Sequence, residues 1–206
     1  GDYDKLPDPP AICPSADYVC FTDQPADARS SVWDFRPITR SERTRALTSR
    51  WYKLHPHELF PDYEYSLWID GNVTIADHGL YDRLESMMTS GTVAAGLRHP
   101  GRDDIYDEAL RILHGRRESL CRVMRTVKFL RREGMPRHFG LYENNVILRR
   151  SSDSQVVSFD ELWWKMLCRF SGRDQLSHTY CLWKTSLDYD LILPAGENAR
   201  NHPFFS

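Results

Sequence analysis

The stretch Tyr65-Ser-Leu-Trp-Ile-Asp-Gly-Asn72 decides the fold class. Its apolar first part is typical of a buried strand over residues 65–69, and Asp70-Gly71-Asn72 ends that strand with turn-forming residues. Ligands of open α/β sheets bind beyond the carboxyl ends of the strands, so this strand would deliver Asp70 to a ligand site. An ordinary turn between strands is the competing interpretation, because Asp-Gly is a common turn signal.

Strands and helices alternate on both sides of this stretch. We expect strands at residues 17–21, 31–35, 92–97, 145–148 and 190–193, and helices at 41–59 (broken near Pro56), 79–90, 103–133 (interrupted near Gly115), 158–171 and 173–184. This order predicts a single α/β domain over residues 1–206, with a mixed, mainly parallel sheet flanked by helices. The opening Gly1–Leu6 segment is typical of the middle of a domain, so we expect the first N-terminal strand to be missing.

Composition narrows the class of protein. The chain has 206 residues, 41% of them hydrophobic, and a formal net charge of -2. These values suit one domain with a real core and argue against a nucleic-acid partner, which needs a broad basic face. Without a run of about 18–20 apolar residues we expect no integral membrane segment. The absence of a signal-peptide pattern, and cysteines that match no zinc template, predict a cytoplasmic protein with reduced thiols.

A basic stripe precedes the strand at residues 65–69. Arg43, Arg50, Lys53 and His57 recur at spacings close to one face of a helix. If that face meets the strand ends, its cations would bind a diphosphate; a solvated charged face is the alternative. His55 and His57 give a weaker indication of a metal site, because the proline between them disturbs the helical spacing.

Two later polar groups also point to binding. Glu143-Asn144-Asn145 precedes an apolar strand, and paired amides suit sugar hydroxyls, which need both donors and acceptors. Arg173-Asp174-Gln175 is expected to begin a helix. A turn explains the first group equally well, and helix capping explains part of the second.

Several motifs together resemble a known family. They occur in the order Gly1-Asp-Tyr-Asp-Lys-Leu6, Tyr18-Val-Cys-Phe-Thr-Asp23, Arg50-Trp-Tyr-Lys53, Tyr65-Ser-Leu-Trp-Ile-Asp-Gly-Asn72, His99-Pro-Gly-Arg102 and Arg173-Asp-Gln-Leu-Ser177. The chain resembles, over nearly its whole length, the glycosyltransferase-like family that includes plant rhamnogalacturonan (pectin) galacturonosyltransferases and bacterial relatives. The resemblance implies a GT-A-type (Rossmann-like) fold and transfer of a sugar from a nucleotide-sugar donor to a glycan or other hydroxyl acceptor. Retention of configuration and a role in polysaccharide synthesis are expected by the same analogy.

The resemblance also implies roles for single residues. Asp70 matches the first acid of an Asp-x-Asp motif, from which Asn72 departs. With His202 these two would form a metal site for Mn²⁺ or Mg²⁺. Asp174 and Gln175 match a pair beside the reacting sugar, with Asp174, together with Asp70, as the catalytic carboxylates.

The donor-binding residues complete this set. Asn144 and Asn145 occupy the place where related retaining enzymes contact the donor sugar. Arg50 and Lys53 would meet the negative charge that builds on the leaving diphosphate.

Two other functions fit parts of the sequence. A sugar or nucleotide-sugar binding module without catalysis is favoured by the non-acidic Asn72. A metal-dependent phosphoesterase would use His55, His57 and Asp70.

Overall fold

The computed structural model of the chain describes residues 6–24 and 30–206, so the Gly1–Leu6 motif, apart from Leu6, lies outside the described residues. The elements follow in the order β1 (Val19–Thr22), β2 (Asp34–Pro37), α1 (Arg45–Leu54), α2 (Pro56–Leu59), β3 (Tyr65–Ile69), α3 (Gly79–Thr89), β4 (Ala94–Arg98), α4 (Ile105–His114), α5 (Leu120–Arg132), β5 (Tyr142–Arg150), α6 (Ser154–Arg169), the 3-10 helix η1 (Asp174–Leu176), α7 (His178–Thr185) and β6 (Asp190–Leu191).

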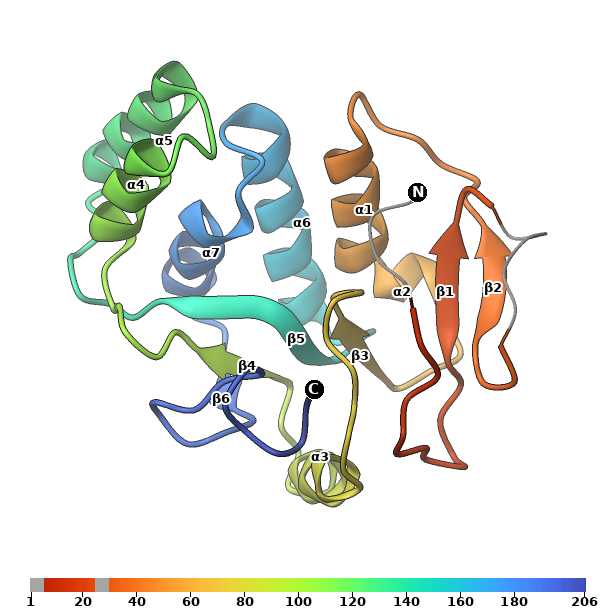
Figure 1. Cartoon of the computed structure of the whole chain (residues 1–206). Coiled ribbons are helices and arrows are strands. Elements are labelled where there is room, and N and C mark those ends of the chain that lie inside the picture. Colours follow the sequence, from red (N-terminus) through yellow and green to blue (C-terminus); the bar gives the residue numbers. More distant parts are fainter. Residues whose placement is uncertain (1–5, 25–29) are drawn as a thin grey trace.

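The strands form a four-stranded sheet in the order β3-β5-β4-β6 and a separate two-stranded sheet of β1 and β2. The α/β class and the mixed sheet flanked by helices are confirmed (Figure 1). The four-stranded sheet is not mainly parallel, however. β5 runs antiparallel to both β3 and β4, and β4 and β6 form the parallel pair of that sheet.

Local capping chemistry sets the helix boundaries. Thr44 accepts a hydrogen bond from Leu47 N (3.1 Å) at the start of α1, and Pro56 opens α2 as a separate turn. The expected break near Pro56 in the helical segment 41–59 is therefore confirmed. The expected interruption near Gly115 is confirmed, because α4 ends at His114 and Ser119 caps α5.

Each face of the four-stranded sheet buries its own hydrophobic cluster. Ile147 packs with residues of α1 and α4–α7 on one face, whereas Val146 and Leu148 pack with α3 and the C-terminal segment on the other (Figure 1). This alternation follows from the two-residue period of a strand. The helices α1, α6 and η1 therefore cover the face of the sheet to which Ile147 points.

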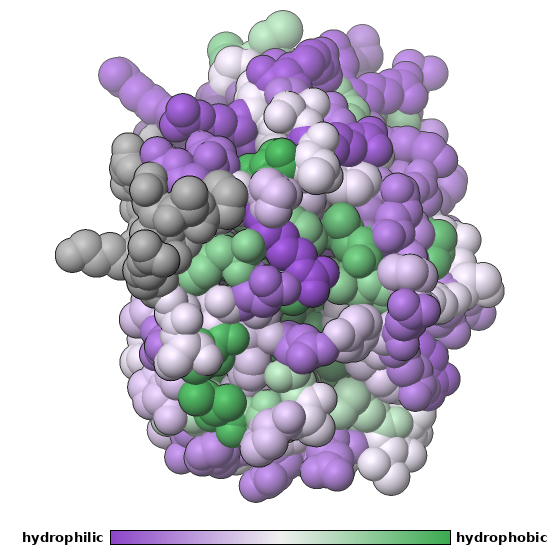
Figure 2. All heavy atoms as spheres, turned by 90° about the vertical axis from the view of Figure 1, so that its right-hand side faces the viewer, coloured by the Kyte–Doolittle hydropathy of each residue, from purple (hydrophilic) through white to green (hydrophobic). Residues whose placement is uncertain are grey.

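On the face that Figure 2 shows, the described side chains form no single apolar surface. Figure 2 shows hydrophobic and hydrophilic side chains interspersed over its visible part. In the described part of the chain, every helix is too short or too polar to span a bilayer.

His178 is an unusual member of the core. It is fully buried, and neither ring nitrogen has a hydrogen-bond partner within the described residues. Aromatic rings surround it, the nearest being Trp163 at a centroid distance of 4.6 Å. Burial, assisted by the nearby positive charge of Lys53, lowers the pKa of His178 to about 3. The ring is therefore neutral at neutral pH.

We expect His178 to make the protein less stable as the pH falls. The unfolded chain takes up a proton near pH 6.5, whereas the folded chain resists it until about pH 3, so stability is full above pH 6.5 and falls below it. His178→Phe should remove about 1.4 kcal/mol of pH dependence per pH unit between pH 6 and 4. Urea unfolding of both proteins across this range measures the difference. Equal slopes would show that His178 takes up its proton at the same pH in the folded and the unfolded chain.

Candidate functional site

A single buried ammonium group lies at the centre of the site. Lys53, in the last turn of α1, has 1% of its side chain exposed. Its Nζ donates to Asp174 Oδ2 (3.2 Å), to Asp70 Oδ1 (3.3 Å) and to the carbonyl oxygen of Asn144. An ammonium group has three N–H donors, so these partners use all of them. Lys53 thereby joins β3, β5 and η1.

Asp70 follows directly after β3, as the sequence predicts. Its backbone N–H donates to Asn145 O (2.8 Å), and its Oδ1 accepts from Trp68 Nε1 (2.6 Å) as well as from Lys53. Two donors therefore fix one carboxylate oxygen. Oδ2 makes no hydrogen bond within the described residues, and a third of the side chain (34%) is exposed.

Asp174 faces the same ammonium from η1. Arg50, one turn before Lys53 on α1, donates from Nε to Asp174 Oδ1 (2.8 Å). Burial alone would raise the pKa of Asp174, but Lys53 and Arg50 outweigh it and hold this pKa below its ordinary value. Asp174 is therefore a buried carboxylate that stays ionised.

The pairing between β4 and β5 is irregular beside Asn144 and Asn145. The pairing with β4 moves from Gly96↔Ile147 to Leu97↔Glu143, so residues 144–146 have no partner on β4. The carbonyl oxygens of Asn144 and Asn145 accept from Lys53 and Asp70 instead. Bulges of this kind are frequent beside active sites, where they redirect side chains.

Polar side chains at this bulge are buried without partners. Both side-chain polar atoms of Asn144, Oδ1 of Asn145 and Oε2 of Glu143 make no hydrogen bond among the described residues. Burial raises the pKa of Glu143, although Arg200 and Arg102 oppose that shift. All three residues lie within β5, which begins at Tyr142 and so starts three residues before the predicted strand at 145–148. Unpaired buried polar groups are costly, so these side chains are unusual for the interior of a folded chain.

The four residues of the predicted basic stripe do not lie together in the structure. Arg50 and Lys53 converge on the carboxylates, as expected for cations facing a strand end. Arg43 precedes the helix and donates to Cys168 O, and His57 belongs to α2. The helix ends between the last two members of the stripe, which explains the divergence.

Three other predicted residues stand apart from the Lys53 network. Gln175 lies half-buried in η1, and Asn72 is exposed in the turn after Asp70. His202 Nε2 lies 3.4 Å from Glu197 Oε2, and its Nδ1 accepts a hydrogen bond from the backbone N–H of Phe204. Among the described residues, no hydrogen bond or ion pair links His202 to Asp70.

The two histidines beside Pro56 also have their own partners. His55 Nδ1 donates to Trp51 O (2.7 Å), and its Nε2 faces Glu161 at 3.6 Å. Burial lowers the pKa of His55. His57 Nε2 lies 3.9 Å from Glu58. Neither ring bonds to Asp70 in the described part of the chain, so the geometry gives the phosphoesterase interpretation no support.

Some supporting residues were not found from the sequence. Arg149 binds Asp160 through Nη1 (2.9 and 3.0 Å), and its Nη2 donates to Lys53 O (2.7 Å). Both partners are buried, so this second ion pair fixes the end of α1 against β5 and α6. The sequence shows only an arginine at the end of an apolar strand, and such an arginine is equally typical of an exposed strand end, so its burial could not be predicted.

A mixed sheet flanked by helices, with carboxylates gathered where β3 ends, is consistent with a GT-A-like glycosyltransferase fold. The chain belongs to the family described as TOD1/MUCI70, glycosyltransferase-like domain, whose model matches residues 42–199. The predicted membership of a glycosyltransferase-like family is confirmed. No curated protein and no solved structure matches the chain.

We expect Lys53→Met to destabilise the fold by about 3 kcal/mol, because it removes one of the two cations that pair with the buried Asp174. Lys128→Met, at an exposed position of α5, is the matched control and should change little. Adding Asp174→Asn to Lys53→Met should cost less than the sum of the single changes, since the unpaired charge is then removed. Urea unfolding measures all four variants. Strictly additive losses would mean that the two residues are not coupled.

Proposed function

We propose that this protein transfers a sugar from a nucleotide-sugar donor to a hydroxyl acceptor at the end of β3. The observation that carries the proposal is the buried network in which Lys53 holds Asp70 and Asp174 together beside unpaired amides. It joins segments far apart in the sequence into one polar site, and family membership makes sugar transfer the chemistry to test.

Arg50 is the cation best suited to the donor diphosphate. Its Nε is used by Asp174, whereas its terminal nitrogens make no hydrogen bond within the described residues. About a quarter of its side chain (24%) is exposed. A guanidinium with free N–H groups binds phosphate oxygens well, and here it would meet the charge that develops on the leaving group. Lys53, whose donors are all used, acts as a positioning residue.

The divalent-cation hypothesis fits Asp70 best. Trp68 and Lys53 donate to its Oδ1 and so fix the orientation of the carboxylate. The other oxygen, Oδ2, would then bind the metal ion. Mg²⁺ and Mn²⁺ sites commonly combine one or two carboxylates with substrate phosphates. When bound, such an ion would supply further positive charge to the diphosphate. Asn72 and His202 remain proposed ligands.

Asp174 is the proposed carboxylate beside the reacting sugar. Because its pKa is held low, it stays negative and favours the positive charge of an oxocarbenium-like transition state. Asn144, Asn145 and Gln175 would bind sugar hydroxyls through their amides. We expect retention of configuration by analogy with the resembled enzymes, and NMR of the first-formed product would establish it.

We expect the cognate nucleotide sugar to raise the melting temperature. A donor at about 100 times its Kd adds roughly 2.7 kcal/mol to stability, which for a chain of this length corresponds to several degrees. A panel of nucleotide sugars, each with and without Mn²⁺, identifies the donor and any metal requirement. Nucleotide release in the presence of acceptors then separates an enzyme from a binding module. If no nucleotide sugar shifts the transition, the proposal is wrong.

We expect Asp174→Asn to lower kcat/KM for transfer by at least roughly 100-fold, because the ionised carboxylate is lost from the transition state. Asp188→Asn, an exposed change just after α7, is the control and should keep wild-type transfer. Thermal melts of both variants check that the fold survives. Wild-type kcat/KM in a folded Asp174→Asn protein would remove Asp174 from the mechanism.

A further inference from the structure

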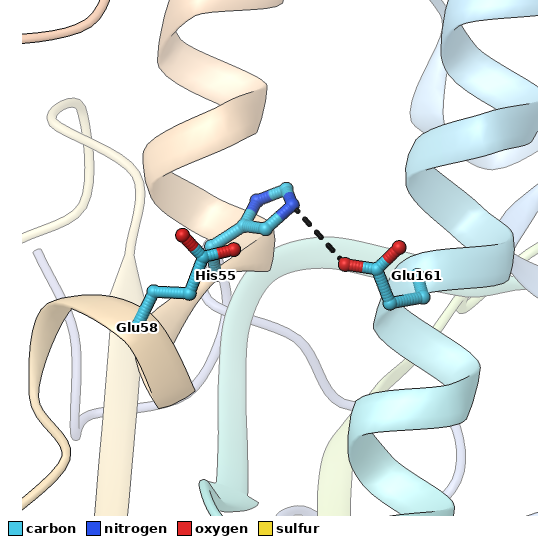
Figure 3. Close-up of side chains that lie close together, drawn as sticks. All are labelled: His55, Glu58 and Glu161. Carbon is cyan, nitrogen blue, oxygen red and sulfur yellow. Dashed lines mark ion pairs between the residues drawn. The ribbon is translucent and has the colours of Figure 1, made fainter.

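A second polar cluster lies at the junction of α1, α2 and α6, separate from the Lys53 network. His55 ends α1, Glu58 lies on α2 and Glu161 lies on α6. Their side chains point toward one another (Figure 3), and the nearest ligand atoms of all three lie within 4.8 Å of one another. The sequence separation of Glu161 explains why the local His-Pro-His-Glu pattern did not reveal the group.

The hydrogen bond to Trp51 determines which nitrogen of His55 is free. A carbonyl oxygen only accepts, so His55 Nδ1 must carry the proton that it shares with Trp51 O (2.7 Å). In the neutral ring Nε2 then presents a lone pair to a carboxylate oxygen of Glu161. Two acceptors face each other at 3.6 Å, which is unfavourable unless Nε2 is protonated or a metal ion lies between them.

The geometry around His55 is that of a preformed ligand. The ring is 97% buried, with 3% exposed, stacks on Trp51 at 4.7 Å and meets Trp164 edge-on at 5.6 Å. Metal-binding histidines almost always donate their second ring N–H to a carbonyl or carboxylate, as His55 does here. The bound tautomer and the ring orientation are therefore already fixed.

The distances also suit a metal ion. With Zn–N and Zn–O bonds of about 2.0–2.2 Å, two ligand atoms of one tetrahedral zinc ion lie about 3.4 Å apart. The observed Nε2–Oε1 distance is 3.6 Å. Glu58 is half-exposed and adjusts by rotation of its side chain, and His57 Nε2 lies 3.9 Å from its Oε1. Lys165 is the cation that competes here, at 3.8 Å from the other oxygen of Glu161.

We propose that His55, Glu58 and Glu161 bind one divalent transition-metal ion, with Zn²⁺ the best match. One imidazole and two carboxylates are a borderline donor set that suits Zn²⁺ better than Mg²⁺ or Ca²⁺, which prefer oxygen alone. The ion would join the α1–α2 turn to α6. Among the described residues, no hydrogen bond or ion pair links this cluster to Asp70 or Asp174, so the ion would be separate from the Lys53 network.

Titration of the full chain with Co²⁺ tests the site directly, since visible absorption reports nitrogen and oxygen ligands without any assay of activity. In the absence of a nucleotide sugar we expect saturation at one equivalent, since an ion at Asp70 would need donor phosphates to complete its ligands. Zn²⁺ should displace the signal and raise the melting temperature. Glu161→Gln removes a ligand while keeping its shape. Loss of a mere outer-shell partner costs roughly 10- to 100-fold in affinity, so loss of this ligand should cost at least that much.

Three further variants make the outcome decisive. Glu58→Gln should weaken Co²⁺ binding in the same way, whereas Glu85→Gln, an exposed glutamate on α3, is the matched control and should leave it unchanged. Asp70→Asn should also leave it unchanged, which separates this site from the proposed donor site. Absence of a saturable Co²⁺ signal in the wild-type chain, or unaltered affinity in both Glu161→Gln and Glu58→Gln, overturns the proposal.

Discussion

The structure depends on the burial of one positive charge. Taking an ammonium group out of water costs several kcal/mol, and only close, well-oriented anionic partners offset that cost. Lys53 meets this requirement with Asp70, Asp174 and a carbonyl oxygen, each from a different element. The end of α1, the end of β3 and η1 must therefore come together for the charge to be stable. Asp70 and Asp174 are thus needed for the fold to be stable, and they are also the carboxylates of the candidate site.

The second buried ion pair extends this constraint through the layer above the sheet. Arg149 links Asp160 of α6 to the carbonyl oxygen of Lys53 itself. Polar interactions consequently connect α6 through β5 and α1 to η1, with the backbone carbonyl of Lys53 as the link between the two charged groups of residues. Low local dielectric strengthens such a path when every group is paired and makes it costly when one is not.

Sequence reasoning succeeded where the controlling physics is local. The strand over residues 65–69, the interruption near Gly115 and the delivery of Asp70 to a strand end follow from periodicity and turn chemistry, and the structure has all three. It failed where partners are distant in the chain. Antiparallel pairing of β5 with β4, the bulge at residues 144–146 and the Arg149–Asp160 pair depend on long-range contacts that no local pattern encodes. Arg50, Lys53, Asp70 and Asp174 were predicted as site residues, and the structure places them together. The sequence did not predict that Lys53 would pair with both carboxylates.

The bulge in β5 has a consequence for how this site can change over evolutionary time. At Asn144 and Asn145 the main chain, not the side chain, supports Lys53 and Asp70. Most residues can supply a carbonyl oxygen equally well, so these two positions are free to vary without dismantling the charged framework. A lineage could thus explore new ligands by exchanging side chains at the bulge, while the residues that hold the fold together stay the same.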